Sequence, residues 1–165
     1  MRLMILRTAA TTMLLFAGPL FLRAAAAQQP EPQPRIEYLS SAETRAAGLP
    51  FSEAVRVGDL IYVSGMLGTR PGTLELAPGG IREETRQALE NIRDIVERAG
   101  SSMERVVKCT AMLADMAEWP AMNEVYVTFF PADRRPARSA FGATALALGA
   151  RVEIECIAAA SRDAP

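Results

Sequence analysis

Two stretches near the end of the chain carry the side chains best suited to chemistry. Pro136 to Ser139, which reads Pro-Ala-Arg-Ser, places Arg138 in a short extended run, where its guanidinium is a candidate anion binder. From Arg151 to Ala158 apolar side chains alternate with Glu153 and Glu155, a period of two that puts both carboxylates on one strand face. Two such acids can meet water, a cation or a cleft, so the pattern alone fits a solvated face as well as a site.

The chain contains no histidine, which removes the commonest general base and the commonest metal ligand. Any catalysis must therefore use carboxylates, arginine, tyrosine, hydroxyls or backbone groups. Cys109 and Cys156 form no Cys-x-x-Cys pair and no metal-binding spacing, and both lie in apolar, strand-like runs. They could form a disulfide in an oxidising compartment if their strands were neighbours. Because adjacent-strand geometry rarely suits that bond, we expect two buried free thiols.

At 165 residues, half of them apolar, the chain suits one domain with a hydrophobic core. Its start resembles a secretory signal peptide, with basic residues, an apolar run from Thr8 to Leu22 and small residues before Ala27. That run is shorter than the roughly 20 residues of a membrane span. We therefore expect a signal peptide (1–27), a flexible linker (28–35) and one domain (36–163), exported to a bacterial periplasm without a stable membrane anchor.

Cleavage after Ala27 changes the charge balance. It removes three arginines and no acid, which leaves 15 basic and 19 acidic side chains and a formal net charge of −4. A surface that binds nucleic acid normally carries a basic stripe, so this balance argues against a nucleic-acid partner.

The hydrophobic pattern predicts strands and two helices. The runs on either side of Gly58-Asp59 alternate as in a β-hairpin whose second strand ends at Gly65, and a loop rich in Gly and Pro follows over 69–80. Strands are expected within 36–39, 53–57, 60–65, 103–115, 136–139 and 151–158.

Both predicted helices are amphipathic. The first covers 82–99 and stops at Gly100. The second follows Asp115, a suitable N-cap, with Pro120 in or near its first turn. Its apolar stripe, which we interpret as facing the core rather than a cofactor, is Met122, Val125, Tyr126 and Phe129.

This order of elements predicts an α+β fold, a two-layer sandwich in which both helices cover one face of a single mixed β-sheet of five to six strands. The other face then has no helix to cover it. Leu60, Tyr62 and the run 143–148 add apolar surface beyond what two helices can hide. We therefore expect an oligomer that closes the open face.

Seven runs of the chain stand in a characteristic order and spacing between about Leu49 and Ala160. They are PFSEAV (50–55), GDLIYVSG (58–65), TRQALENI (85–92), VVKCT (106–110), NEVY (123–126), PARS (136–139) and VEIECIA (152–158). Together they resemble the RidA (YjgF) family of reactive-intermediate deaminases. The resemblance implies a chorismate-mutase-like fold and a homotrimer whose sheets face inward as a barrel, with active-site clefts between subunits.

The resemblance also implies a reaction. Similar proteins hydrolyse 2-imino and enamino acids, which pyridoxal-phosphate enzymes release, to 2-oxo acids and ammonia, with no metal or organic cofactor. The implied partner is a small-molecule carboxylate substrate. One alternative is a non-enzymatic binder of small carboxylate metabolites in the same cleft. Another, the ribonuclease activity of some relatives, agrees poorly with the acidic balance and the missing histidine.

Roles for single residues follow only from the resemblance. Arg138 corresponds to the arginine that binds the substrate carboxylate through two parallel hydrogen bonds, and Glu153 to the acid that holds the hydrolytic water. An ordinary salt bridge from Arg138 to Glu153 or Glu155 at a subunit boundary is the competing interpretation. The positions expected to line the substrate are Phe51, Gly65, Asn123 and Ala140.

Two positions depart from the family pattern. Phe51 stands where the family usually has Tyr, and Met66 stands where it commonly has Gln. Both changes are expected to make the cleft more apolar and to favour larger or more hydrophobic substrates. Glu155 faces the same way as Glu153 but matches no site position, so we expect a structural role for it.

Overall fold

The computed structural model describes residues 33–161. The predicted signal peptide, most of the predicted linker and the end of the predicted domain lie outside this range, and residues 33–35 are exposed and without regular structure. The strands are β1 Ile36–Leu39, β2 Ala54–Val57, β3 Leu60–Leu67, β4 Val106–Leu113, β5 Ala137–Gly142 and β6 Val152–Ala159. The α-helices are α1 Ala42–Ala46, α2 Ile81–Arg98 and α3 Trp119–Tyr126, and the short 3-10 helices are η1 Met103–Arg105, η2 Met116–Glu118, η3 Val127–Phe129 and η4 Ala147–Gly149.

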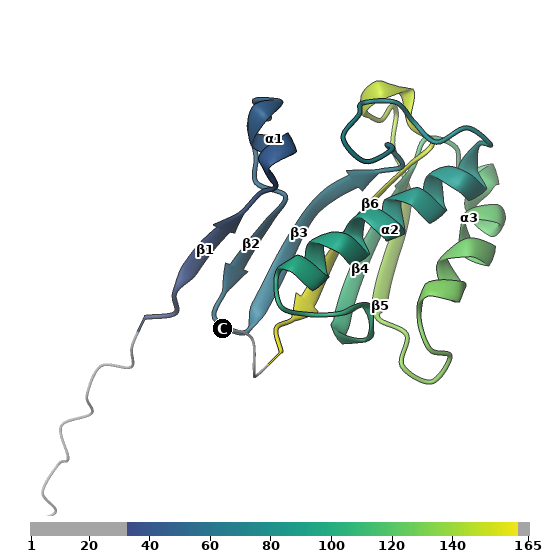
Figure 1. Ribbon diagram of the computed structural model, residues 1–165. Helices are drawn as coiled ribbons and strands as arrows, with labels where there is room; N and C mark the ends of the chain where they lie inside the picture. The colour runs from purple at the N-terminus through teal and green to yellow at the C-terminus, as the bar shows by residue number, and fades with distance from the viewer. Residues whose placement is uncertain (1–32, 162–165) are drawn as a thin grey trace, which may run out of the picture. The chain divides into compact units, whose positions relative to one another are not determined.

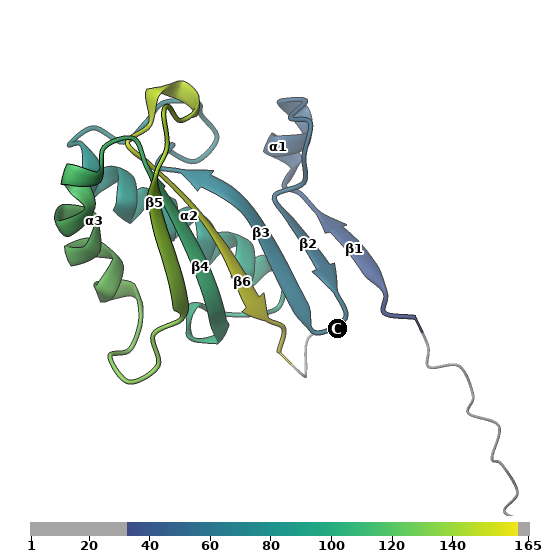
Figure 2. The same cartoon turned by 180° about the vertical axis from the view of Figure 1, so that it is seen from behind.

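The six strands form one mixed sheet in the order β1-β2-β3-β6-β4-β5. All neighbours are antiparallel except β4 and β5, which are parallel. The last strand, β6, therefore lies in the middle of the sheet. Both α2 and α3 lie on one face (Figure 1), and the view from behind shows the other face with no helix of residues 33–161 over it (Figure 2). The predicted α+β sandwich is confirmed.

The two predicted helices form because each can bury one apolar stripe. In α2 the buried residues include Leu89, Ile92 and Val96, and the helix starts and ends one residue before its predicted bounds. Gly100, with φ of +77°, follows it as the predicted stop. Asp115 accepts a hydrogen bond from the Ala117 N–H at 2.8 Å, but the helix that it caps is η2, which leads into α3.

Two local features differ from the sequence expectations. β3 continues past Gly65 to Leu67, because a bulge between Val63 and Met66 lets the strand keep pairing with β6. The short helix α1 lies in a polar segment for which the pattern predicts no helix. Its N-cap Ser41 and its Thr44 both donate hydrogen bonds to the carboxylate of Glu53, a partner that is not local in sequence.

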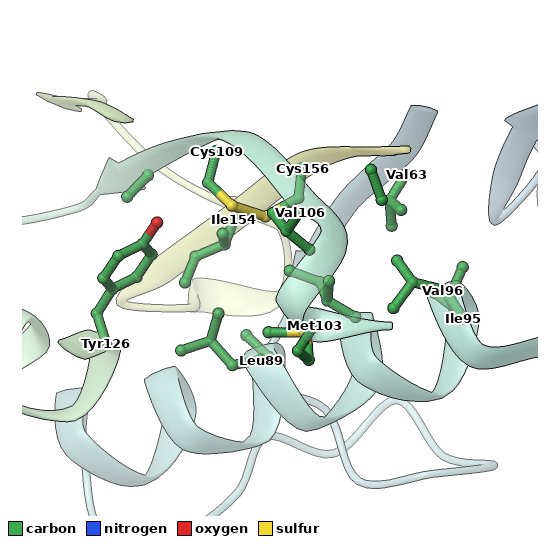
Figure 3. Close-up of a cluster of buried hydrophobic side chains, with 14 of the residues drawn as sticks. Val63, Leu89, Ile95, Val96, Met103, Val106, Cys109, Tyr126, Ile154 and Cys156 are labelled. Atoms are coloured by element: carbon green, nitrogen blue, oxygen red, sulfur yellow. A yellow bond between two sulfur atoms is a disulfide. The ribbon is translucent and has the colours of Figure 1, made fainter. Parts of the chain in front are cut away.

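The expectation of free thiols is wrong, because Cys109 and Cys156 form a disulfide. They face each other directly across the antiparallel pair of β4 and β6, with their Cα atoms 4.1 Å apart. The closely spaced pairs of an antiparallel ladder bring side chains nearest to each other, which is what this bond requires. Figure 3 shows the bond inside the apolar layer between the sheet and the helices.

The open face of the sheet carries apolar side chains, as predicted. Leu60 and Tyr62 on β3 are about 40% exposed, at 39% and 44% respectively. Leu148, in the run 143–148, is also exposed.

Among residues 33–161, no helix has the length and apolar content needed to cross a membrane.

Candidate functional site

Arg138 faces the helices from the outermost strand of the sheet. It stands beside Cys109, which is fully buried on the helix side of β4, and its guanidinium carbon lies 4.4 Å from the centre of the Tyr126 ring on α3. Within residues 33–161, Arg138 has no ion pair with an acid. Its charge is therefore available to a ligand.

A pocket of about 210 Å³ opens at this guanidinium, and we call it the arginine pocket. Its lining residues are Asn123, Tyr126, Val127, Arg135, Pro136 and Arg138. Two guanidinium groups and one amide line it and no carboxylate does, so its chemistry suits an anion. The structure thus brings Asn123, which is expected to line the substrate, into the same pocket as Arg138.

Ala140 lies close to this pocket along the same strand. It is two residues after Arg138, so it shares the helix-side face and packs partly against the core. Within the described part of the chain β5 pairs only with β4, so its other edge presents unpaired backbone groups.

Glu153 lies on the open face of the sheet. It stands on β6 between Val152 and Ile154, both fully buried on the helix side, so its own side chain points the other way. It lies across the backbone of Gly65, where a Cβ atom would overlap the carboxylate and come within 2.8 Å of its Cδ carbon. The structure therefore brings Glu153 and Gly65 together as expected.

The environment of Glu153 changes its acidity. Burial raises the pKa of its carboxyl group, and repulsion from the Glu155 carboxylate on the same face raises that pKa further. Such a group accepts a proton more readily at neutral pH than an ordinary carboxylate does. Glu153 is thus suited to holding and deprotonating a water molecule.

The backbone next to Phe51 is tied to the same region. The Ser64 hydroxyl donates to the Ser52 carbonyl at 2.7 Å, and the Ser64 N–H donates to the Glu53 carbonyl at 2.9 Å. These bonds hold the backbone that follows the half-exposed Phe51 against the backbone that precedes Gly65. Phe51, Gly65 and Glu153 form what we call the glutamate patch.

Met66 does not belong to this patch. It pairs with the buried Ile154 and packs against the core on the helix side of the sheet. The expectation that Met66 makes the cleft more apolar is therefore wrong for this chain. The bulge in β3 explains why, because it turns Met66 away from the face that carries Glu153.

The arginine pocket and the glutamate patch do not meet within one chain. Arg138 and Glu153 lie on opposite faces of the sheet, on β5 and β6, with β4 between them. An ion pair between them within the chain is excluded by the same geometry. A site that uses both residues therefore requires two copies of the chain.

Tyr126 is a pocket residue that the sequence reasoning missed. Its place in the apolar stripe of α3 predicts only a core position, and it is indeed 2% exposed. The contact with Arg138 depends on how α3 sits over β5, which no local pattern reveals.

In residues 33–161, no group of three His, Cys, Asp or Glu is arranged to hold a metal ion.

The chain matches a known protein family over most of its length. The family model described as endoribonuclease L-PSP matches residues 42–160. The chain belongs to the RidA (YjgF) family. A mouse member named 2-iminobutanoate/2-iminopropanoate deaminase is 45% identical over 122 residues, which cover 74% of this chain and 90% of the mouse protein. A goat member with the same name is 47% identical over 120 residues, covering 73% and 87% respectively.

Solved structures of the RidA family share this fold. A YjgF family member from Neisseria meningitidis is 30% identical, with a TM-score of 0.65 over 79% of this chain and 98% of that protein. The yeast protein YEO7 is 34% identical, with a TM-score of 0.71 over 77% of this chain and all of the yeast protein. The chorismate-mutase-like fold that the resemblance implied is confirmed.

Proposed function

We propose that this protein is a hydrolytic deaminase that converts 2-imino and enamino acids to 2-oxo acids and ammonia and so removes reactive intermediates. The observation that carries the proposal is that Arg138 has no ion pair within residues 33–161 and lines a pocket without a carboxylate, in a chain 45% identical to a protein named as an imine deaminase. The arginine pocket then binds the substrate carboxylate through two charge-assisted hydrogen bonds from the Arg138 guanidinium.

The reaction needs one water molecule and a route for its protons. Glu153 holds the water, whose oxygen attacks the C=N carbon while the carboxylate accepts a proton from it. That proton passes to the nitrogen, which gives a tetrahedral carbinolamine. The carboxylate then takes the proton of the new hydroxyl group and returns it to the amino nitrogen, so the C–N bond breaks, ammonia leaves and a C=O group remains. The raised pKa of Glu153 suits this exchange, because the carboxyl group must both accept and return the proton.

The active site belongs to a homotrimer. The proposed site pairs the arginine pocket of one subunit with the glutamate patch of its neighbour, and the position of Arg138 and Glu153 on opposite faces of the sheet supports this arrangement. The apolar open face, with Leu60 and Tyr62, lies inside the assembly. The expected oligomer therefore completes the site as well as covering the sheet.

Turnover is tested with a 2-imino acid generated in situ by an amino-acid oxidase. Wild type is expected to accelerate its loss and to release ammonia. Arg138→Ala is expected to lower kcat/KM by at least about 100-fold, the scale of two charge-assisted hydrogen bonds. Arg134→Ala is the matched control, since Arg134 is exposed, pairs with Asp133 and does not line the pocket. A wild type no faster than buffer, or an Arg138→Ala variant as fast as wild type, contradicts the proposal.

The same preparation separates the deaminase from a non-enzymatic binder. A binder that uses the same cleft shows saturable thermal stabilisation by 2-oxobutanoate without any turnover. The family description also names an endoribonuclease, so RNA is included as a second substrate. RNA cleavage that disappears with Arg138→Ala, together with imine loss by wild type no faster than in buffer, would replace the deaminase with a ribonuclease.

Export to a periplasm is part of the proposal. The leader pattern of residues 1–27 and the disulfide between Cys109 and Cys156 both support it, because disulfides persist in oxidising compartments. Fractionation of expressing bacteria, with the N-terminus of the mature protein determined, is expected to give periplasmic protein that begins after Ala27. Full-length protein in the cytoplasm would contradict export.

A further inference from the structure

We propose that Tyr126 is a positioning residue that holds the Arg138 guanidinium in the orientation that receives the substrate carboxylate; this rests on the proposed function. The guanidinium carbon lies 4.4 Å from the centre of the ring. At that distance a cation is attracted to the face of an aromatic ring, and a flat guanidinium stacks on it. Its edge N–H groups then remain available to a ligand.

The Tyr126 ring is itself firmly held. It is 2% exposed, and its centre lies 4.9 Å from that of Phe130 in a tilted contact. Figure 3 shows the ring extending from α3 toward the sheet, with its hydroxyl among apolar side chains. A rigid ring beneath the long Arg138 side chain limits the orientations of the guanidinium before a ligand binds. The guanidinium then loses less conformational entropy on binding.

A second arginine in the structure shows the difference between stacking alone and stacking in a pocket. The guanidinium carbon of Arg93 lies 5.0 Å from the centre of the Phe129 ring. Arg93 also donates a hydrogen bond to the Glu90 carboxylate at 2.6 Å, so its guanidinium is already paired with an acid. Arg138 has no such acid among the described residues and lines a pocket, which leaves the aromatic ring as the group that orients it.

The hydroxyl of Tyr126 does not explain why tyrosine is here. It is buried and has no hydrogen-bond partner among the described residues. Burial raises the pKa of this phenol to about 12, against a smaller opposing effect of the Arg138 charge, so the phenol stays protonated at neutral pH. The aromatic face therefore matters, and phenylalanine is expected to replace tyrosine without loss.

The test measures binding of 2-oxobutanoate, the stable product of 2-iminobutanoate hydrolysis, by calorimetry. Tyr126→Leu removes the ring and is expected to weaken binding about three- to tenfold, the range for one cation–aromatic contact. Tyr126→Phe keeps the ring and is expected to bind within about twofold of wild type. In turnover, Tyr126→Leu is expected to raise KM with little change in kcat, because the ring acts on binding.

Phe129→Leu is the matched control. It removes an aromatic face from under the other arginine, close to α3, and so reports the effect of loosening this part of the core. The affinity of the Phe129→Leu variant for 2-oxobutanoate is expected to stay within about twofold of that of wild type. Equal losses in Phe129→Leu and Tyr126→Leu, or wild-type binding by Tyr126→Leu, would overturn the proposal.

A measurement on folded wild type covers the case in which Tyr126→Leu does not fold. Protons over the face of an aromatic ring resonate upfield, so the Arg138 side-chain protons, assigned by comparison with Arg138→Lys, are expected upfield of those of Arg135. Arg138 protons at ordinary shifts would overturn the proposal. If Arg138→Ala binds 2-oxobutanoate as wild type does, the carboxylate role of Arg138 fails, while the shift still decides the stacking.

Discussion

Arg138 and Glu153 lie on opposite faces of one sheet, on strands that both pair with β4. The two side chains that the proposed reaction uses are therefore separated by the backbone of their own subunit. In the proposed reaction this arrangement makes catalysis depend on assembly, because one substrate then lies between the pocket of one copy and the patch of another.

Two inactive variants are expected to restore activity to each other. Arg138→Ala and Glu153→Gln are unfolded together, refolded as mixed trimers and assayed for imine loss. With random mixing of equal amounts, roughly a quarter of the clefts receive an intact arginine from one subunit and an intact glutamate from the next. Activity no greater than that of the separately refolded variants would mean that no cleft is shared between subunits.

Gly65→Ala is expected to displace the Glu153 carboxylate and to lower kcat by about 10- to 100-fold, the scale of a misplaced catalytic group. The backbone at Gly65 does not have a positive φ, so the overlap with Glu153 is the conflict that alanine introduces. The control is the same substitution in a Glu153→Ala background, where it should cost little further stability. An unchanged kcat in Gly65→Ala would show that the carboxylate does not need its observed position.

Glu153→Gln is expected to stabilise the protein at neutral pH. The pKa of Glu153 is raised in the folded chain, so the unfolded chain loses its proton first as pH rises, and the folded form then becomes relatively less stable. Melting temperatures of wild type and variant should agree near about pH 4 and separate by pH 7. Glu155→Gln should show part of the same gain, because it removes the repulsion. A larger gain at pH 4 than at pH 7 would contradict this sign.

Glu53 is expected to behave in the opposite way. Burial alone would raise the pKa of Glu53, but hydrogen bonds from Thr44, Arg98 and Ser41 outweigh it and lower that pKa. The contribution of the charged form to stability is present above the ordinary carboxyl pKa and is lost as pH falls through the lowered value. Glu53→Gln should therefore lower the melting temperature at pH 7, with a difference that shrinks on acidification. A constant difference across that range would show that the charge is not responsible.

The disulfide is expected to contribute about 4 kcal/mol to the free energy of unfolding, because it closes a loop with a sequence separation of 47 residues in the unfolded chain. Urea unfolding of wild type with and without a reducing agent measures this contribution. The double variant Cys109→Ala/Cys156→Ala is the control and should not respond to the reductant. An equal response of both proteins would mean that the thiols are free.

Local patterns determined most of the elements in advance. The helix that buries Leu89 and Ile92, the hairpin around Gly58-Asp59 and the alternation on the last strand all depend on neighbours within a few residues. Hydrophobic spacing therefore predicts them directly. The helix α1 escaped such a prediction, because the acid that binds its first turn, Glu53, comes from the next strand.

Only the tertiary structure decided which residues of different strands and helices lie side by side. The alternation of apolar and polar residues shows which side chains share a face of one strand. It does not show how that face relates to the faces of other strands. Strand order and register placed Arg138 on the side opposite Glu153, and they paired Cys109 with Cys156. The packing of α3 on β5 then put Tyr126 under Arg138. The sequence by itself thus determined the family and the candidate residues, whereas the placement of Arg138 and Glu153 on opposite faces came from how the sheet is assembled.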